Sequence, residues 1–149
     1  MGKFANQVRA FVDVAKEDMR YVATEAIQDV VEAAQTTQLG VTRGADGFEE
    51  GKIPVGLTAD LVNSLTSSLN GGGETEGPDG YTTVIANFDL GDSMRFAWPM
   101  EYAMRVEHGF TGTDELGRKF NQAGRHFVGA NVARFPEFVE ARVREVRGK

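Results

Sequence analysis

The chain has 149 residues, of which 41% are hydrophobic and 26% are charged, and it contains no cysteine. This length suits a single domain, and the composition excludes a wholly disordered or collagen-like chain. The lack of cysteine excludes disulfide bonds, thiolate metal sites and cysteine nucleophiles. Apolar runs reach only three or four residues, against the roughly 20 of a membrane-spanning helix, and no secretory signal opens the sequence. We therefore expect a soluble chain, made in the cytoplasm and without a membrane partner.

The formal charge of −6 is distributed unevenly along the chain. Residues 1–117 hold 8 cationic and 19 acidic side chains, whereas residues 118–149 hold 8 cationic and 3 acidic ones. Such an acidic body is a poor general binder of nucleic acid, because phosphate binding favours a basic face. The opposed blocks favour head-to-tail contact between copies; a solvated basic helix end that stabilises its own macrodipole is the alternative.

Residues 3–36 are predicted to form one long amphipathic helix. Its apolar residues recur at spacings of three and four, which places them on one stripe. The stripe consists of Phe4, Val8, Phe11, Ala15, Met19, Val22, Ala26, Val30 and Ala33. At 1.5 Å per residue the helix would be about 50 Å long, more than a domain of this size needs to cover itself. We therefore expect part of the stripe to pack against another copy; packing wholly on its own sheet is the alternative.

Residues 37–56 are rich in glycine and poor in apolar side chains, which predicts the first of three flexible loops. A short helix is expected over residues 57–64, with Thr58 placed to cap it, and a strand over residues 65–69. The acidic, glycine-rich segment 70–80 predicts the second loop, as a long hairpin tip. Loops of this kind are expected to be mobile in the free monomer and to become ordered on docking.

Residues 81–88 are β-branched and aromatic throughout and predict the best strand in the chain. A further short strand is expected over residues 94–98. Residues 100–108 then predict a short helix, with Gly109 just past its end. Its buried face would hold Tyr102, Ala103 and Val106.

Residues 109–124 predict the third glycine-punctuated loop. The last helix is expected over residues 125–147, with Pro136 kinking it or dividing it in two. Such a bend would wrap the helix across a curved sheet. The predicted fold class is therefore α+β, one domain over residues 1–149: a long N-terminal helix, a small antiparallel sheet, a short helix and a kinked C-terminal helix packed on the sheet.

Signatures of catalysis and metal binding are missing from the sequence. The two histidines, His108 and His126, lie 18 positions apart, outside the spacings of zinc enzymes. Residues 71–73 form a glycine triplet, but acidic residues follow it, where a phosphate-binding loop needs a lysine-containing helix start. The turn carboxylates match no calcium-loop pattern: Asp89, Asp92, Asp114 and Glu115. The sequence therefore predicts no enzyme, no metal and no cofactor.

Three segments carry a resemblance to a known family. The first holds Pro54, Val55, Thr58, Leu61 and Ser64, the second holds Tyr102, Ala103, Val106, Glu107 and Gly109, and the third is Gly124 to Val128. In order and spacing they resemble the motifs of a tail-component (neck) family of long-tailed double-stranded DNA bacteriophages. The first segment departs from the motif by one extra residue after Val55, at Ala59, where the family has glycine, and at Val62, where it has arginine.

The resemblance implies a structural protein of the virion that acts in head–tail joining or tail completion. Its subunits would form a homo-oligomeric ring, six-fold or a multiple of six, at the head–tail junction. Its partners would be the connector or head-closure protein and the tail tube or tail terminator protein, and DNA would pass through the acidic channel without specific binding. Three groups of charged residues are expected at interfaces: Glu74, Glu76 and Asp79; Asp114 and Glu115 within loop 110–123; and Arg142, Arg144, Arg147 and Lys149.

Three other functions stay open at the level of the sequence. The first is a tail terminator, which is also a virion protein but caps the tail tube instead of lying at the neck. A small regulatory or toxin-like module that binds a partner protein belongs to a different class. A hydrolase would need a pocket that gathers Glu107, His108 and a serine.

Overall fold

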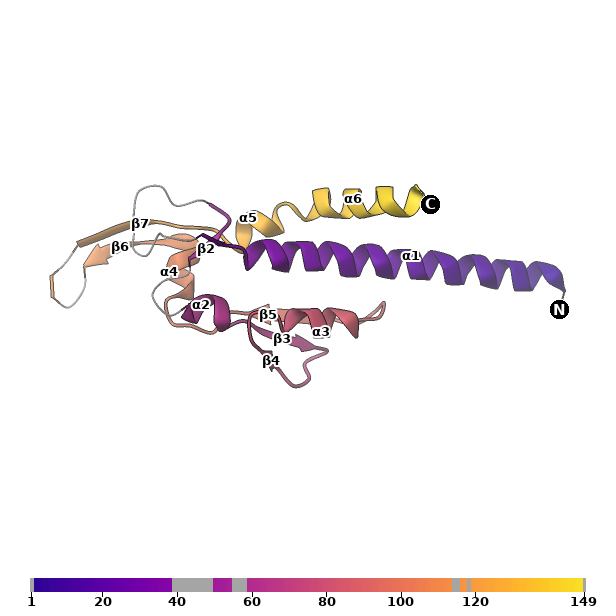
Figure 1. Cartoon of the computed structure of the whole chain (residues 1–149), viewed down its shortest axis with the longest axis horizontal. Coiled ribbons are helices and arrows are strands. Elements are labelled where there is room, and N and C mark those ends of the chain that lie inside the picture. Colours follow the sequence, from indigo (N-terminus) through magenta and orange to yellow (C-terminus); the bar gives the residue numbers. More distant parts are fainter. Residues whose placement is uncertain (1, 39–49, 55–58, 114–115, 118, 149) are drawn as a thin grey trace.

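The computed structural model describes residues 2–38, 50–54, 59–113, 116–117 and 119–148. Within them the chain forms an elongated α+β structure with the long N-terminal helix as its spine (Figure 1). This confirms the predicted class. The elements are α1 (Lys3–Ala34), β1 (Thr37–Gln38), β2 (Ile53–Pro54), α2 (Asp60–Asn63), β3 (Thr66–Leu69), β4 (Thr75–Glu76), α3 (Tyr81–Ala86), β5 (Met94–Ala97), α4 (Ala103–His108), β6 (Gly109–Thr113), β7 (Lys119–Ala123), α5 (Gly129–Val132) and α6 (Phe135–Arg147).

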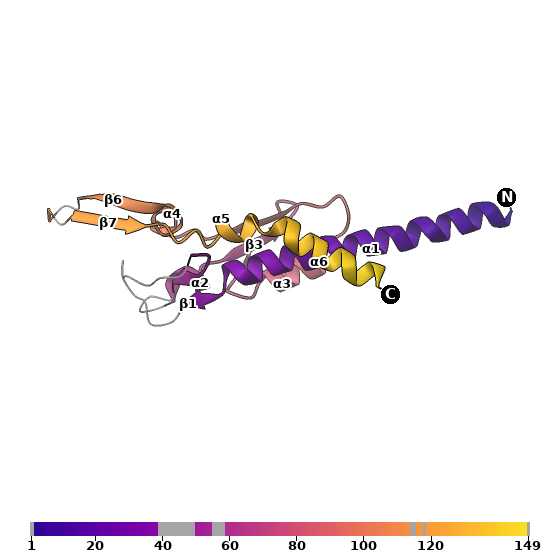
Figure 2. The same ribbon diagram turned by 90° about the horizontal axis from the view of Figure 1, so that it is seen from above.

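The long helix α1 is confirmed, and only its C-terminal half is packed. Its buried residues are Thr24, Ala26, Val31 and Ala34. The N-terminal half extends past every other element, as two perpendicular views show (Figures 1 and 2). The helix is thus divided into a half that belongs to the core and a half that projects from it.

A three-stranded antiparallel sheet lies beside α1, in the order β4-β3-β5. The predicted strands at residues 65–69 and 94–98 correspond to β3 and β5, paired from Thr66 with Ala97 to Leu69 with Met94. Helix α3 contacts both α1 and β3. One core cluster fills the space between these elements and consists of Val31, Leu65, Tyr81 and Ile85.

The strand predicted for residues 81–88 is wrong, because most of this segment is helix α3. Its buried residues Tyr81, Val84 and Ile85 follow the spacing of one helical face, whereas Thr82 and Thr83 are exposed. Packing of that face against α1 and β3 outweighs the β propensity of the individual residues. The hairpin of segment 70–80 consequently joins β3 to the short strand β4, with Ser67 opposite Thr75.

The loop predicted for residues 109–124 is also wrong, since this segment is a two-stranded antiparallel hairpin of β6 and β7. Helix α4 ends at Gly109, which has a φ of 85°, a backbone conformation that favours glycine. The hairpin projects at the end of the molecule opposite the N-terminus (Figures 1 and 2). Of loop 37–56, residues 39–49 and 55–56 lie outside the described residues, and β1 and β2 pair in parallel.

The C-terminal helix is divided in two, as Pro136 predicts, into α5 and α6. Pro136 lies in the first turn of α6, where its missing backbone donor costs nothing. The expected packing on the sheet is wrong, because the main contact of α6 is with α1 (Figure 1). An apolar face on each helix allows this side-by-side arrangement.

Candidate functional site

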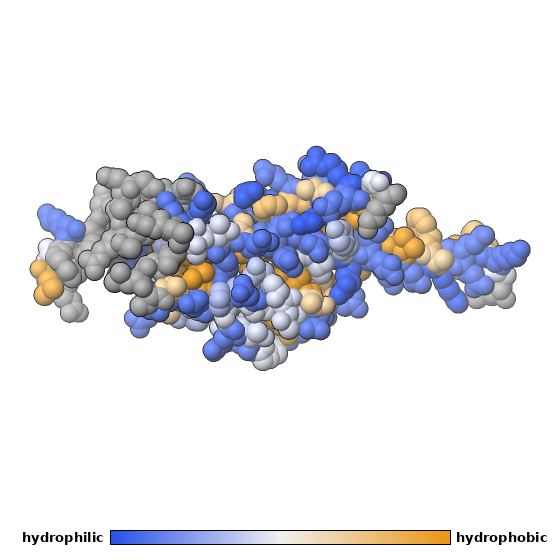
Figure 3. All heavy atoms as spheres, in the orientation of Figure 1, coloured by the Kyte–Doolittle hydropathy of each residue, from blue (hydrophilic) through white to orange (hydrophobic). Residues whose placement is uncertain are grey.

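An apolar helix surface projects from the subunit at its N-terminal end. We call residues 3–16 of α1 the N-terminal arm; every side chain in it except Ala5 and Ala15 is exposed. Phe4 and Phe11 are 78% and 74% exposed, and Figure 3 shows apolar side chains on this part of the molecule. Exposed apolar surface of this kind is typical of sites that bind another protein, a membrane or a ligand.

The same stripe continues from the N-terminal arm into an apolar groove between α1 and α6. We call it the α1–α6 groove, and its volume is about 420 Å³. Its walls are Met19, Val22 and Ala23 from α1 and Phe135, Val139, Val143 and Val146 from α6, with Asp18 and Arg147 beside them. Met19 is 60% exposed. The groove and the N-terminal arm together form our candidate functional site.

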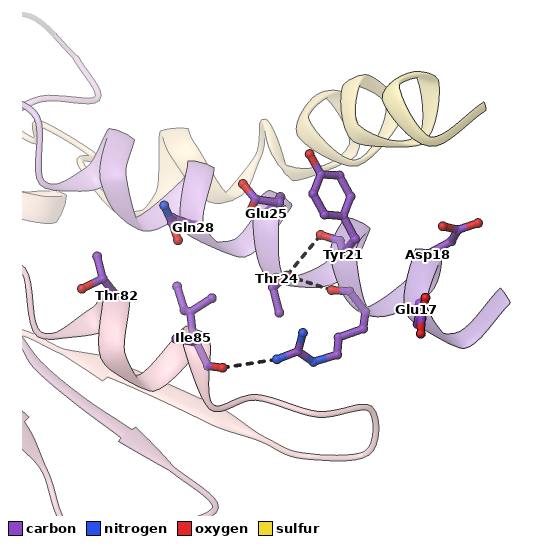
Figure 4. Close-up of a pocket in the computed structure, with 10 residues that line it drawn as sticks. Glu17, Asp18, Tyr21, Thr24, Glu25, Gln28, Thr82 and Ile85 are labelled. Carbon is purple, nitrogen blue, oxygen red and sulfur yellow. Dashed lines mark hydrogen bonds between the residues drawn. The ribbon is translucent and has the colours of Figure 1, made fainter. Parts of the chain in front are cut away.

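A polar hollow of about 500 Å³ lies on another side of α1, against α3 (Figure 4). Arg20 donates from Nε to the Phe88 carbonyl at 2.8 Å and from Nη2 to the Ala86 carbonyl at 3.2 Å. These bonds cap the C-terminal end of α3, so the guanidinium is used to join two helices. Glu17, Glu25 and Thr82 also line the hollow. The described residues that line the hollow include no histidine that could activate a nucleophile. We therefore assign the hollow a structural role.

The basic end of the chain is used differently from the sequence prediction. Arg142, expected at an intermolecular contact, binds Asp29 of its own α1 through two hydrogen bonds of 2.9 and 2.8 Å. It also pairs with Glu25 at 3.6 Å and Glu145 at 3.1 Å. The bond to Asp29 raises the pKa of the Arg142 guanidinium above its ordinary value. Arg142 therefore holds α6 on α1 within one copy.

The remaining predicted interface residues do not gather at one place. Arg144 is exposed and lies 3.9 Å from Glu140 in the same helix, and Arg147 lies at the α1–α6 groove. The exposed acidic residues Glu74, Glu76 and Asp79 belong to the segment around β4, and Figure 1 places β4 and α6 on opposite sides of α1. Asp114, Glu115 and Lys149 lie outside the described residues.

Glu107 has a structural role at the junction of two motif segments. Its carboxylate accepts the backbone N–H groups of Val128 at 3.0 Å and Gly129 at 2.7 Å, at the start of α5. The His108 and His126 rings lie edge to face, 6.4 Å apart. Ser64, a motif serine, donates to the Leu61 carbonyl within its own turn. This arrangement gives no support to the hydrolase alternative.

The three motif segments converge on one part of the fold. Leu61 and Phe127 are buried in one core cluster with Ile53, the neighbour of Pro54, and Ala103 and Val106 pack against it. Thr58 and Val55 lie outside the described residues, and Tyr102, expected to be buried, is 39% exposed. Of the motif residues, Leu61, Ala103 and Val106 thus belong to this core or pack against it, whereas Tyr102 does not.

Close backbone contact explains Gly124 in the third motif segment. Arg125 donates its backbone N–H to the Val106 carbonyl at 2.7 Å, and His126 donates to the Glu107 carbonyl at 3.0 Å. A Cβ atom on Gly124 would lie only 2.5 Å from that Glu107 oxygen. The absence of a side chain therefore lets the two motif segments meet.

Sequence analysis identified the apolar stripe of the N-terminal helix but missed that α6 packs against it. The pairing of Arg142 with Asp29 and Glu25 was also missed. No local pattern links Arg142 to Asp29, which lies 113 positions away in the sequence, and Glu25 lies further away still. The half-buried valines Val139, Val143 and Val146 of α6 follow one another at spacings of four and three, which is the sequence signal of an apolar helix face. The α1–α6 groove itself exists only because the two helices pack side by side.

Comparison with family models and searches of curated proteins and solved structures gave no match for this chain. Within the described part of the chain, no three histidine or acidic residues gather in a way that would hold a metal ion. No helix among the described residues combines the length and apolar character needed to cross a membrane. The candidate functional site is therefore interpreted from the residues that form it.

Proposed function

We propose that this protein is a structural subunit of a tailed-phage virion that forms a ring at the head–tail junction. The observation that carries the proposal is the N-terminal arm, an apolar helix surface that leaves the body of the subunit. Burial of each exposed phenylalanine against a neighbour would contribute about 2 kcal/mol. A subunit that exposes such a surface gains stability by association with a second molecule.

The elongated shape supports a head-to-tail arrangement of subunits. The N-terminal arm and the β6–β7 hairpin project at opposite ends of the molecule (Figure 1). Different surfaces at opposite ends favour heterologous contacts, which close into rings when the rotation between subunits permits it. A ring is the form that a channel for DNA requires.

The residues that resemble the neck family support the position within the virion. They form a single unit of α4, the start of α5 and the core around Leu61, as expected for the signature of a fold. In this proposal the ring joins the connector or head-closure protein to the tail tube or terminator protein. The acidic body of the chain lets DNA pass without specific binding.

Electron microscopy of intact particles tests the proposal. We expect the chain at the head–tail junction, in six copies or a multiple of six. Particles that lack the chain altogether would overturn the proposal. A deletion mutant separates two positions: finished tails that fail to join heads support the neck, whereas tails of variable length support a tail terminator.

A further inference from the structure

We infer that the N-terminal arm of one copy docks into the α1–α6 groove of a neighbouring copy of the same chain. The inference rests on the proposed function, because it names the contact that would build the ring. It commits to a second copy as the occupant of the α1–α6 groove. Four observations support this choice.

The two surfaces match in chemistry. The arm presents Phe4, Val8, Phe11 and Ala15 on one face, and the α1–α6 groove is walled by valines and a phenylalanine of α6 with apolar residues of α1. An amphipathic helix that lays its apolar face into a hydrophobic groove is a common mode of recognition. Docking would complete a packed arrangement of three helices.

The two surfaces also match in length. Phe4 and Ala15 are 11 residues apart along α1, and Phe135 and Val146 are 11 residues apart along α6. At 1.5 Å per residue each stripe is about 17 Å long. One arm therefore covers the whole α6 wall of the groove and leaves little of either stripe exposed.

Charge favours this contact over pairing between two arms. The N-terminal arm holds Lys3, Arg9 and Lys16 against Asp13, a net charge of +2. The two helix segments that wall the groove, residues 17–34 of α1 and 135–147 of α6, together hold eight acidic and four basic side chains, a net charge of −4. An arm on the body of a second copy brings opposite charges together, whereas two paired arms would repel each other.

The geometry of α1 excludes docking within one copy. The N-terminal arm and one wall of the groove belong to the same continuous helix, and the arm leads straight away from the groove (Figures 1 and 2). A rigid helix cannot fold back onto its own side. The contact is therefore intermolecular and heterologous, the kind that propagates around a ring.

Disulfide trapping tests the contact directly, because the chain has no cysteine of its own. Phe11→Cys and Val143→Cys are introduced into two separate variants of the chain. The two purified variants are mixed and oxidised, and particles that contain both variants are oxidised in the same way. We expect a covalent dimer in the mixture and little in either variant alone. A covalent dimer formed by Phe11→Cys alone would indicate pairing between arms and would overturn the inference.

A substitution pair provides the second test. Phe4→Gln/Phe11→Gln removes the apolar face of the arm, and Asn6→Gln/Ala10→Gln places the same residue on the opposite, exposed face. We expect the phenylalanine variant to lose self-association and assembly into particles and the control variant to keep both. We expect the two variants to have the same melting temperature. Assembly of both variants would overturn the inference.

The outcomes separate the inference from the proposed function. If microscopy finds the chain at the head–tail junction but neither preparation gives the mixed disulfide, the inference is overturned and the proposed function stands. If the mixed disulfide forms but particles lack the chain, the docking is supported and the proposed function is overturned.

Discussion

Arg142 of α6 and Asp29 of α1 form a two-pronged ion pair, with Nε and Nη2 donating to the two carboxylate oxygens at 2.9 and 2.8 Å. Both side chains are largely shielded from solvent. This pair joins α6 to α1, the two helices that wall the α1–α6 groove. The candidate functional site therefore depends on an interaction between two helices of the same chain.

We expect Arg142→Ala to destabilise the protein by about 2 kcal/mol, because it removes charge-assisted hydrogen bonds and leaves Asp29 half-buried without its main partner. The matched control is Arg144→Ala, an exposed arginine of the same helix, for which we expect a change within about 0.5 kcal/mol. Urea unfolding of both variants measures the difference. Equal effects would contradict the role given to Arg142.

The bond from Tyr21 to Glu145 predicts a dependence of stability on pH. Tyr21 donates to the Glu145 carboxylate at 2.7 Å, which lowers the pKa of Glu145 below its ordinary 4.5 and raises the pKa of Tyr21 above its ordinary 10.0. The Glu145 contribution is present above pH 4.5 and is lost as the pH falls through the lower, folded value. The Tyr21 contribution is present below pH 10.0 and is lost as the pH rises through its higher, folded value.

Titration by NMR checks this prediction. In Tyr21→Phe we expect the pKa of Glu145 to move up towards 4.5, although its bond to Arg142 remains. Tyr102→Phe is the control. The pKa of Tyr102 is raised by burial and by Asp60, so we expect its loss to leave the pKa of Glu145 unchanged. An unchanged Glu145 pKa in Tyr21→Phe would show that the tyrosine does not hold the carboxylate.

Ala59 has a φ of 57° just before α2, in the left-handed region where a Cβ atom is strained. We expect Ala59→Gly to stabilise the protein by about 0.5 to 1 kcal/mol, since relief of strain exceeds the added freedom of the unfolded chain. Ala133→Gly is the control: its φ is −62°, and we expect a loss of about 1 kcal/mol. Thermal unfolding of each variant shows whether its melting temperature rises, as expected for Ala59→Gly, or falls, as expected for Ala133→Gly.

Gly124 is the most sensitive glycine that the structure describes in the motif segments. A Cβ atom there would lie 2.5 Å from the Glu107 oxygen and 2.7 Å from the His108 carbonyl carbon, and both are backbone atoms that cannot move away alone. We expect Gly124→Ala to cost about 2 to 3 kcal/mol. At Gly73 nothing lies within 4 Å, so Gly73→Ala is expected to be neutral or slightly stabilising. Similar melting temperatures for the two variants would refute the close approach.

Several elements could be predicted from local sequence patterns alone. The helical stripe of α1, the strands β3 and β5, the end of α4 at Gly109 and the division of the last helix near Pro136 are all visible in the sequence. Each depends on interactions between residues a few positions apart, such as helical periodicity, a glycine at positive φ or a proline without a donor.

Contacts between distant segments decided the rest. Residues 81–86 are helical because their buried face meets α1 and β3, and segment 109–124 is a hairpin because its two halves pair with each other. The partner of Arg142 and the existence of the α1–α6 groove depend on how α6 lies along α1. Periodicity shows which face of a helix is apolar, but only the packed chain shows which part of that face is covered and which part stays exposed.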